Sequence, residues 1–107
     1  MRVKVELNRA AAADVAGLPA ADRQDFLRRL EEVAAAPITR SVVHCEPGLT
    51  FAVRRFVFGC GIARIAIFRY DLAAGRMQVL RCRVQYPREL REPKPESGTG
   101  AGPAPDK

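Results

Sequence analysis

The sequence predicts an α+β fold: an N-terminal strand, a hairpin of two helices, and an antiparallel β-meander with the helices packed on one sheet face. Three observations predict it. Apolar residues recur at helical spacing up to about residue 35, and after about residue 40 they alternate as in strands. Glycine and proline separate these segments. Hydrophobic residues make up 48% of the 107 residues, which is enough for one small core.

The N-terminal elements are predicted by alternation and by helix-end signals. Residues 2–7 alternate polar and apolar side chains, as a half-buried strand does. Asn8 is a good N-cap for a short helix that Gly17 closes. A second helix is predicted over residues 20–35, where apolar side chains recur every three or four positions, and Pro37 ends it.

The remainder of the folded part is predicted as strands joined by short turns. A short strand or strand edge is expected over residues 41–45, followed by strands over residues 49–58, 62–70 and 76–84. Consecutive strands with short connections form an antiparallel meander, so three or four strands can present one face to the two helices.

Composition divides the chain into two parts. Residues 91–107 contain four prolines, three glycines and no apolar side chain larger than alanine. Such a segment cannot bury a core, so we expect a disordered tail there. We expect one folded domain over residues 1–90.

The cysteines and the N-terminus bear on where the protein works. The three cysteines cannot all pair within one chain, and none forms a C-x-x-C pair, which argues against a disulfide scaffold and the usual zinc spacings. The N-terminus lacks the apolar segment of a signal peptide, and no apolar run approaches the ~20 residues of a membrane span. We therefore expect a cytoplasmic protein with reduced thiols, no metal site and no cofactor.

The positive charge is concentrated in one segment. The chain has a formal net charge of +6, and the whole excess lies in residues 51–90, which hold eight arginines and two acidic residues. Arginine presents a planar fork of donors that matches phosphate and carboxylate groups. This distribution suggests a polyanion or an acidic protein as partner. The preference for arginine over lysine also fits the composition bias of a GC-rich genome.

Strand alternation predicts a candidate site. If the Ile, Leu and Val sets of the last three strands face the helices, four arginines emerge together on the uncovered face, with Phe56 and Phe68 beside them. These arginines are Arg54, Arg64, Arg81 and Arg83. Guanidinium groups flanked by aromatic rings suit single-stranded RNA or a phosphate backbone. The alternative is a solvated outer face on which arginine keeps the sheet soluble. The single histidine, His44, is expected to have a structural role.

The order of the elements and several local phrases resemble the RelE/ParE toxin superfamily. The resemblance runs from Val3 to about Leu90. It rests on the strand phrase Val3–Leu7, the joint Leu18-Pro19 before the second helix, Ala36-Pro37 before the strands, and the phrases 49–54 and 61–68.

The resemblance implies the toxin of a type II toxin–antitoxin system, wrapped by a segment of a cognate antitoxin in a hetero-oligomer. RelE-like members cleave mRNA in the ribosome, and ParE-like members inhibit DNA gyrase. The resemblance implies catalytic roles for Arg64, Arg83 and Tyr86 and RNA contacts for Arg54, Arg64 and Arg83. The strand pattern adds Arg81 as an RNA contact.

The sequence leaves three hypotheses for the function open. All candidate groups except Tyr86 are arginines, which stabilise phosphate charge well but are poor general bases because the arginine pKa is above ~12. The first hypothesis is a metal-independent endoribonuclease. The second is a ParE-like gyrase inhibitor that performs no catalysis. The third is an inactive relative whose basic face docks an acidic partner.

Overall fold

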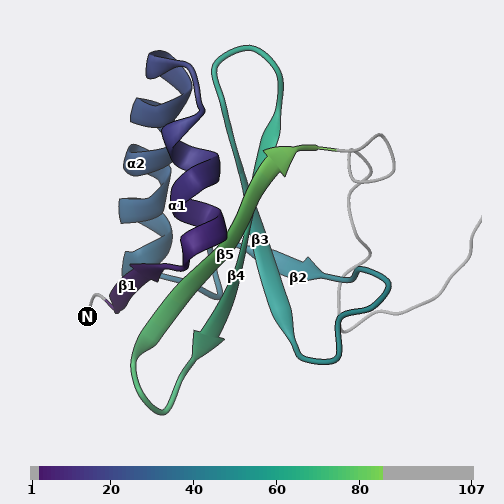
Figure 1. Cartoon of the computed structure of the whole chain (residues 1–107). Coiled ribbons are helices and arrows are strands. Elements are labelled where there is room, and N and C mark those ends of the chain that lie inside the picture. The colour runs from purple at the N-terminus through teal and green to yellow at the C-terminus, as the bar shows by residue number, and fades with distance from the viewer. Residues whose placement is uncertain (1–2, 86–107) are drawn as a thin grey trace, which may run out of the picture.

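The computed structural model describes residues 3–85, which form a five-stranded sheet with two helices on one side (Figure 1). The elements in chain order are β1 (Lys4–Leu7), α1 (Arg9–Ala16), α2 (Ala20–Ala35), β2 (Val42–His44), β3 (Val53–Phe58), β4 (Arg64–Asp71) and β5 (Arg76–Val84). The candidate Tyr86 and the predicted tail 91–107 lie outside the described residues.

The sheet is mixed, with strand order β1-β5-β4-β3-β2. Strands β2 to β5 form the predicted antiparallel meander, and β1 adds to β5 in parallel. The predicted fold class is therefore confirmed. Strands β3 and β4 begin later than predicted, because residues 49–52 and 62–63 belong to the loops that precede them.

The helix-end signals act as expected. Asn8 Oδ1 accepts the N–H of Ala11 at 2.8 Å and so caps α1. Gly17 closes that helix by donating its N–H to the carbonyls of Ala13 and Asp14 at 3.2 Å each. Helix α2 ends two residues before Pro37, whose ring disfavours helical backbone at the residue before it.

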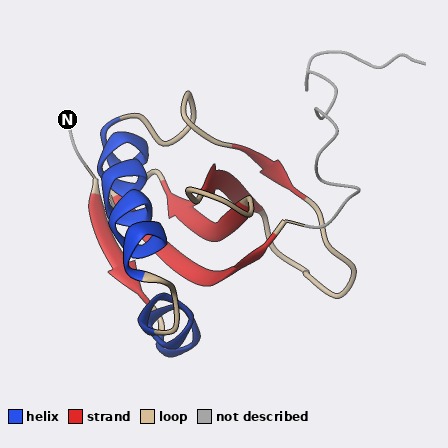
Figure 2. Cartoon of the chain, turned by 90° about the horizontal axis from the view of Figure 1, so that it is seen from above, coloured by secondary structure: helices blue, strands red, loops and turns tan. Residues whose placement is uncertain are grey.

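The main core lies between the helices and one face of the sheet (Figure 2). Phe26 of α2 packs edge-on against Phe58, with ring centroids 5.2 Å apart, and stacks near Phe56 at 6.1 Å. A second apolar cluster, built around Val53, Ile65 and Ile67, contains no helix residue. We call the sheet face that carries this second cluster the open face.

The predicted assignment of the two faces is wrong for β3 and β4. Phe56 and Phe68 lie under the helices in the main core, and the branched aliphatic residues line the open face. Because β-strand side chains alternate, Arg54 and Arg64 share the helix side of the sheet with Phe56 and Phe68. Aromatic rings bury more apolar area than Val or Ile, and Phe26 of α2 packs directly against Phe56, which in turn contacts Phe68.

A β-bulge changes the alternation within β5. Ile67 pairs with Arg81 and Phe68 pairs with Val79, so Leu80 is an extra residue between them. Met77 and Val79 lie in the main core before the bulge, whereas Arg81 and Arg83 lie on the open face after it, although uninterrupted alternation would place all four on one face. An inserted residue reverses the side-chain pattern of a strand, and this explains the difference.

Carboxylates of α2 anchor the β3–β4 hairpin. Asp25 Oδ2 accepts the N–H of Gly59 at 2.7 Å, and Asp22 Oδ1 accepts the N–H of Cys60 at 2.9 Å. Gly59 has φ +119°, and a Cβ there would lie 2.6 Å from the carbonyl oxygen of Ile62. This turn therefore requires glycine, and it presents two backbone donors to the helix.

Candidate functional site

The open face carries charged side chains around its small apolar cluster. Strand alternation and the pairing register place five arginines on it, namely Arg55, Arg69, Arg76, Arg81 and Arg83. Three of them, Arg55, Arg69 and Arg76, were not among the predicted site residues. The arginine-rich segment therefore does reach the open face, but with a different set of members.

A buried polar network crosses this face. Arg55 Nη1 lies 3.1 Å from Nδ1 of His44, and His44 Nε2 lies 3.0 Å from Oε1 of Glu46. The same Glu46 oxygen accepts Nη2 of Arg83 at 3.2 Å. The His44 side chain is completely buried, whereas the side chains of Arg83 and Glu46 are 18% and 36% exposed. We call these four residues the His44 network.

The electrostatics of the network favour an ionised glutamate. The hydrogen bond from His44 lowers the pKa of the Glu46 carboxyl, and Arg83 lowers it further, against the opposing effect of burial. The network therefore combines two guanidiniums, one carboxylate and an imidazole in a partly enclosed place. Such an arrangement can hold the guanidinium of Arg83 in a defined orientation near the surface.

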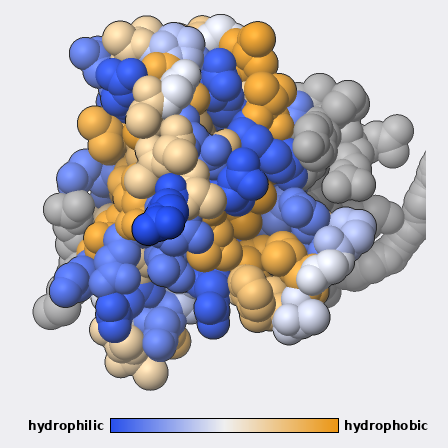
Figure 3. All heavy atoms as spheres, viewed as in Figure 1, coloured by the Kyte–Doolittle hydropathy of each residue, from blue (hydrophilic) through white to orange (hydrophobic). Residues whose placement is uncertain are grey.

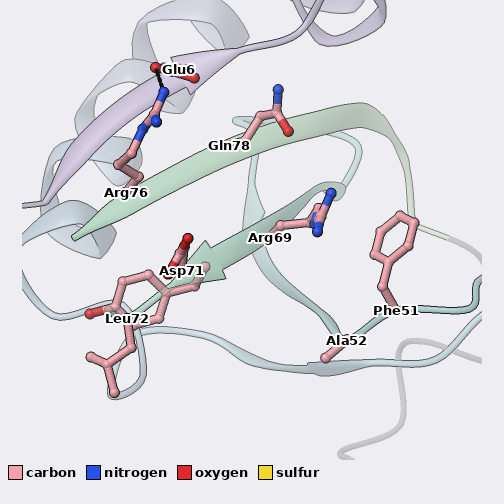
Figure 4. A pocket seen from close by; sticks show the side chains of 9 residues that line it. Glu6, Phe51, Ala52, Arg69, Asp71, Leu72, Arg76 and Gln78 are labelled. Carbon is pink, nitrogen blue, oxygen red and sulfur yellow. Dashed lines mark hydrogen bonds and ion pairs between the residues drawn. The ribbon is translucent and has the colours of Figure 1, made fainter. Parts of the chain in front are cut away.

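A hollow of about 560 Å³ opens toward the other end of the sheet (Figure 4). The Arg69 guanidinium lies 4.5 Å from the centroid of the Phe51 ring, in a cation–π contact. Arg76 pairs with Glu6 at 2.6 Å, and Gln78 points into the same space. The hollow thus offers a stacked cation and polar groups of both signs.

Two predicted site residues hold the fold on the helix side. Arg64 Nε lies 2.9 Å from Oδ2 of Asp22, which is itself buried. Arg54 donates to the hydroxyl of Ser41 at 2.6 Å and to the carbonyls of Ser41 and Ile38. The expectation that four arginines share the uncovered face is therefore wrong for this pair, because both side chains extend toward α2 or the segment that follows it.

The other two candidates differ from each other. Arg83 belongs to the His44 network, whereas Arg81 reaches over the sheet edge to Asp14 of α1, with Nε 2.8 Å from Oδ2. Asp14 also accepts the N–H of Cys82, and the hydrogen bond from Arg81 lowers the pKa of its carboxyl.

Hydrophilic side chains are spread over the helices and β5 in the space-filling view, with apolar ones between them (Figure 3).

Sequence reasoning missed Arg55, Glu46, Arg69 and Phe51. Arg55 lies in the same alternation set as Val53 and Val57, and a charged residue in an otherwise apolar set was the available signal. Glu46 stands in the turn after β2, and no spacing rule connects a turn residue to a strand that is distant in the sequence. His44 was assigned only a structural role, and its contacts with Arg55 and Glu46 now give that role a specific form.

Two further observations concern residues 3–85 only. No group of three or more His, Cys, Asp or Glu side chains in this part of the chain is placed to hold a metal ion. Neither helix is long and apolar enough to cross a membrane.

Comparison with known proteins identifies the architecture. No family model and no curated protein sequence matches this chain. A chain in the crystal structure of the toxin–antitoxin complex RelBE2 from Mycobacterium tuberculosis superposes with a TM-score of 0.63, at 14% identity, over 79% of this chain and 93% of that chain. The chain has a RelE-like fold.

A second solved structure gives the same result. A chain of the archaeal RelE–RelB complex from Pyrococcus horikoshii has a TM-score of 0.61 and 16% identity, and the match covers 78% of this chain and 96% of that one. The resemblance to the RelE/ParE superfamily is thus confirmed at the level of the fold. Within this RelE-like fold, the described part of the open face carries the His44 network and the Arg69–Phe51 stack.

Proposed function

We propose that this chain is the toxin of a type II toxin–antitoxin system and acts in the cytoplasm as a ribosome-dependent mRNA endoribonuclease, held inactive by a cognate antitoxin. The observation that carries the proposal is a RelE-like sheet whose uncovered face presents Arg83 within a buried polar network. The two solved structures described above are a toxin–antitoxin complex and a RelE–RelB complex, which supports a protein partner of the antitoxin type.

The proposed reaction is phosphodiester cleavage by the RNA itself. The 2′-hydroxyl gives its proton to water and its oxygen forms a bond to the adjacent phosphorus, the bond from phosphorus to the 5′ oxygen breaks, and that oxygen takes up a proton from water. Arg83 stabilises the negative charge that develops on the phosphate oxygens. Arginine does not serve as the base, because its pKa is above ~12. Tyr86, the proton carrier that the family resemblance implies, lies outside the described residues.

The hollow adds a binding function to this scheme. An unpaired base can stack on the Arg69 guanidinium, which already rests on Phe51. Ile65 of β4 is paired with Arg83, and Arg69 lies four residues further along the same strand. That separation corresponds to about 13 Å along a strand. A short stretch of extended RNA therefore can reach both the stack and Arg83.

A second candidate function is binding without catalysis, either to DNA gyrase or to another acidic partner. One observation favours it: the imidazole of His44 is completely buried and bonded to Arg55 and Glu46, so this group does not reach a substrate directly. A toxin that lacks a proton carrier would still present the arginines of the open face to a partner.

Induced expression of the full chain in a bacterial host tests the proposal. We expect growth arrest, with new RNA ends mapped within ribosome-bound messages, and we expect Arg83→Ala to abolish both. Arg29→Ala, on the exposed side of α2 with a side chain 47% exposed, is the matched control and should arrest growth as the unmodified chain does. Arrest with intact mRNA and inhibited gyrase supercoiling would support the second candidate. Normal growth at verified soluble expression would overturn the toxin proposal.

A further inference from the structure

We propose that Glu46, held by His44, is a positioning residue that orients the Arg83 guanidinium toward the substrate phosphate. The inference rests on the proposed function, because it assigns Arg83 to the phosphate. It adds two residues to the site that neither the strand pattern nor the family resemblance implied.

The first step concerns how Glu46 reaches Arg83 at all. Strands β3 and β4 lie between β2 and β5 in the sheet order. Neighbouring strands are about 4.8 Å apart, so a flat sheet would separate β2 from β5 by about 14 Å. The sheet is curved (Figure 2), and the hydrogen bond between Glu46 and Arg83 shows that a side chain of the segment after β2 reaches the end of β5. Glu46 is therefore brought to Arg83 by the curvature and by this segment.

The second step concerns how the carboxylate of Glu46 is fixed. Arginine is only a donor, so Nδ1 of His44 must accept the bond from Arg55. The imidazole proton is then on Nε2 and is donated to Oε1 of Glu46. A glutamate at the surface normally samples several rotamers, but here a fully buried imidazole holds one oxygen in place.

The third step concerns the orientation of Arg83. Its Nη2 donates to the oxygen that His44 fixes, and its Nη1 donates to the carbonyl of Val84 at 3.0 Å. Two bonds from the two Nη atoms define the plane of the guanidinium. The plane matters because recognition of a phosphate by arginine depends on the direction of its N–H groups. A misplacement of about 1 Å can lower a rate by about 100-fold.

The His44 network positions Arg83 rather than simply stabilising the fold. Replacing a whole buried polar network by well-packed apolar residues often leaves the stability of a protein unchanged. Replacing His44 alone by an apolar residue would fill a similar volume, but it would leave Glu46 without its donor and the buried Arg55 without its acceptor. The geometry of the network therefore has its clearest consequence at Arg83, the member of it that the proposed reaction uses.

The test compares variants of the full chain on a ribosome-bound message and reads the Arg83 side chain directly. We expect kcat to fall about 10- to 100-fold in His44→Phe and in Glu46→Ala, with little change in KM. His44→Gln keeps one acceptor and one donor and should recover part of the rate. Glu46 is partly exposed, so its replacement should leave the protein folded, and Glu31→Ala on the exposed side of α2 is the control.

Nitrogen-15 NMR of the Arg83 Nε–H supplies a readout that needs no activity. We expect one ordered signal in the unmodified chain and in Glu31→Ala, and an averaged signal in Glu46→Ala and His44→Phe. An unchanged Arg83 signal in both variants overturns the inference. So does cleavage at the normal rate in both variants while Arg83→Ala is inactive, and in that case the proposed function stands. If the unmodified chain does not cleave RNA but the ordered Arg83 signal is lost in both variants, the proposed function is overturned and the positioning of Arg83 is supported.

Discussion

Arg55 donates from Nη1 to Nδ1 of His44 across 3.1 Å, and both side chains are buried on the sheet face that the helices leave uncovered. This contact makes the histidine an acceptor on one side and a donor on the other. It also explains why a charged residue occurs in the apolar set of β3. The arginine has a buried partner, so its charge is satisfied where an unpaired one would be costly.

The first prediction concerns the stability that this contact supports. Arg55→Met keeps much of the side-chain volume but leaves Nδ1 of His44 without a donor. We expect the free energy of unfolding to fall by about 1–3 kcal/mol, the cost of an unsatisfied buried polar group. Urea denaturation followed by circular dichroism measures the change. Arg29→Met, on the surface of α2, should change the value by no more than about 0.5 kcal/mol. Equal effects of the two substitutions would contradict the role given to Arg55.

The second prediction separates arginines of the fold from arginines of the site. Arg64 pairs with the buried Asp22, whereas Arg83 lies on the open face. We expect Arg64→Ala to lower the melting temperature clearly, because it leaves a buried carboxylate without its cation. Arg83→Ala should lower the melting temperature less and abolish growth arrest. Thermal denaturation and induced growth of the two variants, measured side by side, decide the matter. Loss of toxicity without loss of stability in Arg64→Ala would return Arg64 to the site.

The third prediction concerns acid stability. The backbone N–H of Cys60 lowers the pKa of Asp22, and the backbone N–H of Gly59 lowers that of Asp25. Carboxyls with lowered pKa values in the folded state stabilise it above their unfolded pKa of about 4, where the unfolded chain also is ionised. This stabilisation is lost as the pH falls through the lower folded values, because the unfolded state binds protons first.

Melting temperatures measured from pH 7 down to pH 2 test this. We expect the unmodified chain to lose stability steeply below about pH 4. Asp22→Asn should melt lower at pH 7 and show a shallower fall, so the two curves approach each other in acid. Gln24→Ala, on the exposed side of α2, serves as a control for substitution in this helix and should follow the curve of the unmodified chain. Parallel curves for Asp22→Asn and the unmodified chain would show that this carboxyl does not contribute to the pH dependence.

The fourth prediction concerns thiol reactivity. Cys45 and Cys60 are exposed, whereas Cys82 is buried. Burial, together with a smaller effect of the nearby Asp14, raises the pKa of the Cys82 thiol to about 12, so at pH 8 this group is almost entirely protonated. We expect a thiol reagent to label two cysteines quickly in the native protein and the third only after denaturation. Mass spectrometry of the peptides identifies the slow residue, and rapid labelling of Cys82 would contradict its buried position.

The fifth prediction concerns the Arg69–Phe51 stack and rests on the proposed function. Phe51→Ala removes the platform on which the guanidinium lies. We expect affinity for a short single-stranded RNA to fall by about 1–3 kcal/mol, the usual contribution of one stacked base. Fluorescence anisotropy with a labelled oligonucleotide measures it. Leu72→Ala, another exposed residue that lines the hollow, serves as control and should bind nearly as before. The same loss in both variants would argue against stacking.

Local sequence signals were sufficient for the order and type of the elements. The N-cap at Asn8, the end of α2 before Pro37 and the change of period after residue 40 all depend on neighbours in the chain, and each is found in the structure. The resemblance to RelE/ParE toxins followed from the same order, and the fold confirms it. Interactions within one turn of helix or one strand are encoded by adjacent residues, so the sequence alone determines them.

Only the tertiary structure decided which side chains face the site. The bulge at Leu80 and the packing of Phe26 on the aromatic side of the sheet set the two faces, and neither is visible in a single strand. The tertiary structure also explains the uneven distribution of basic and acidic residues along the sequence. Four arginines of the second half pair with carboxylates from residues 1–50, in Arg64–Asp22, Arg76–Glu6, Arg81–Asp14 and Arg83–Glu46. Partners so distant in the sequence meet only when the sheet curves and the helices pack, because that is what brings opposite charges within hydrogen-bonding distance.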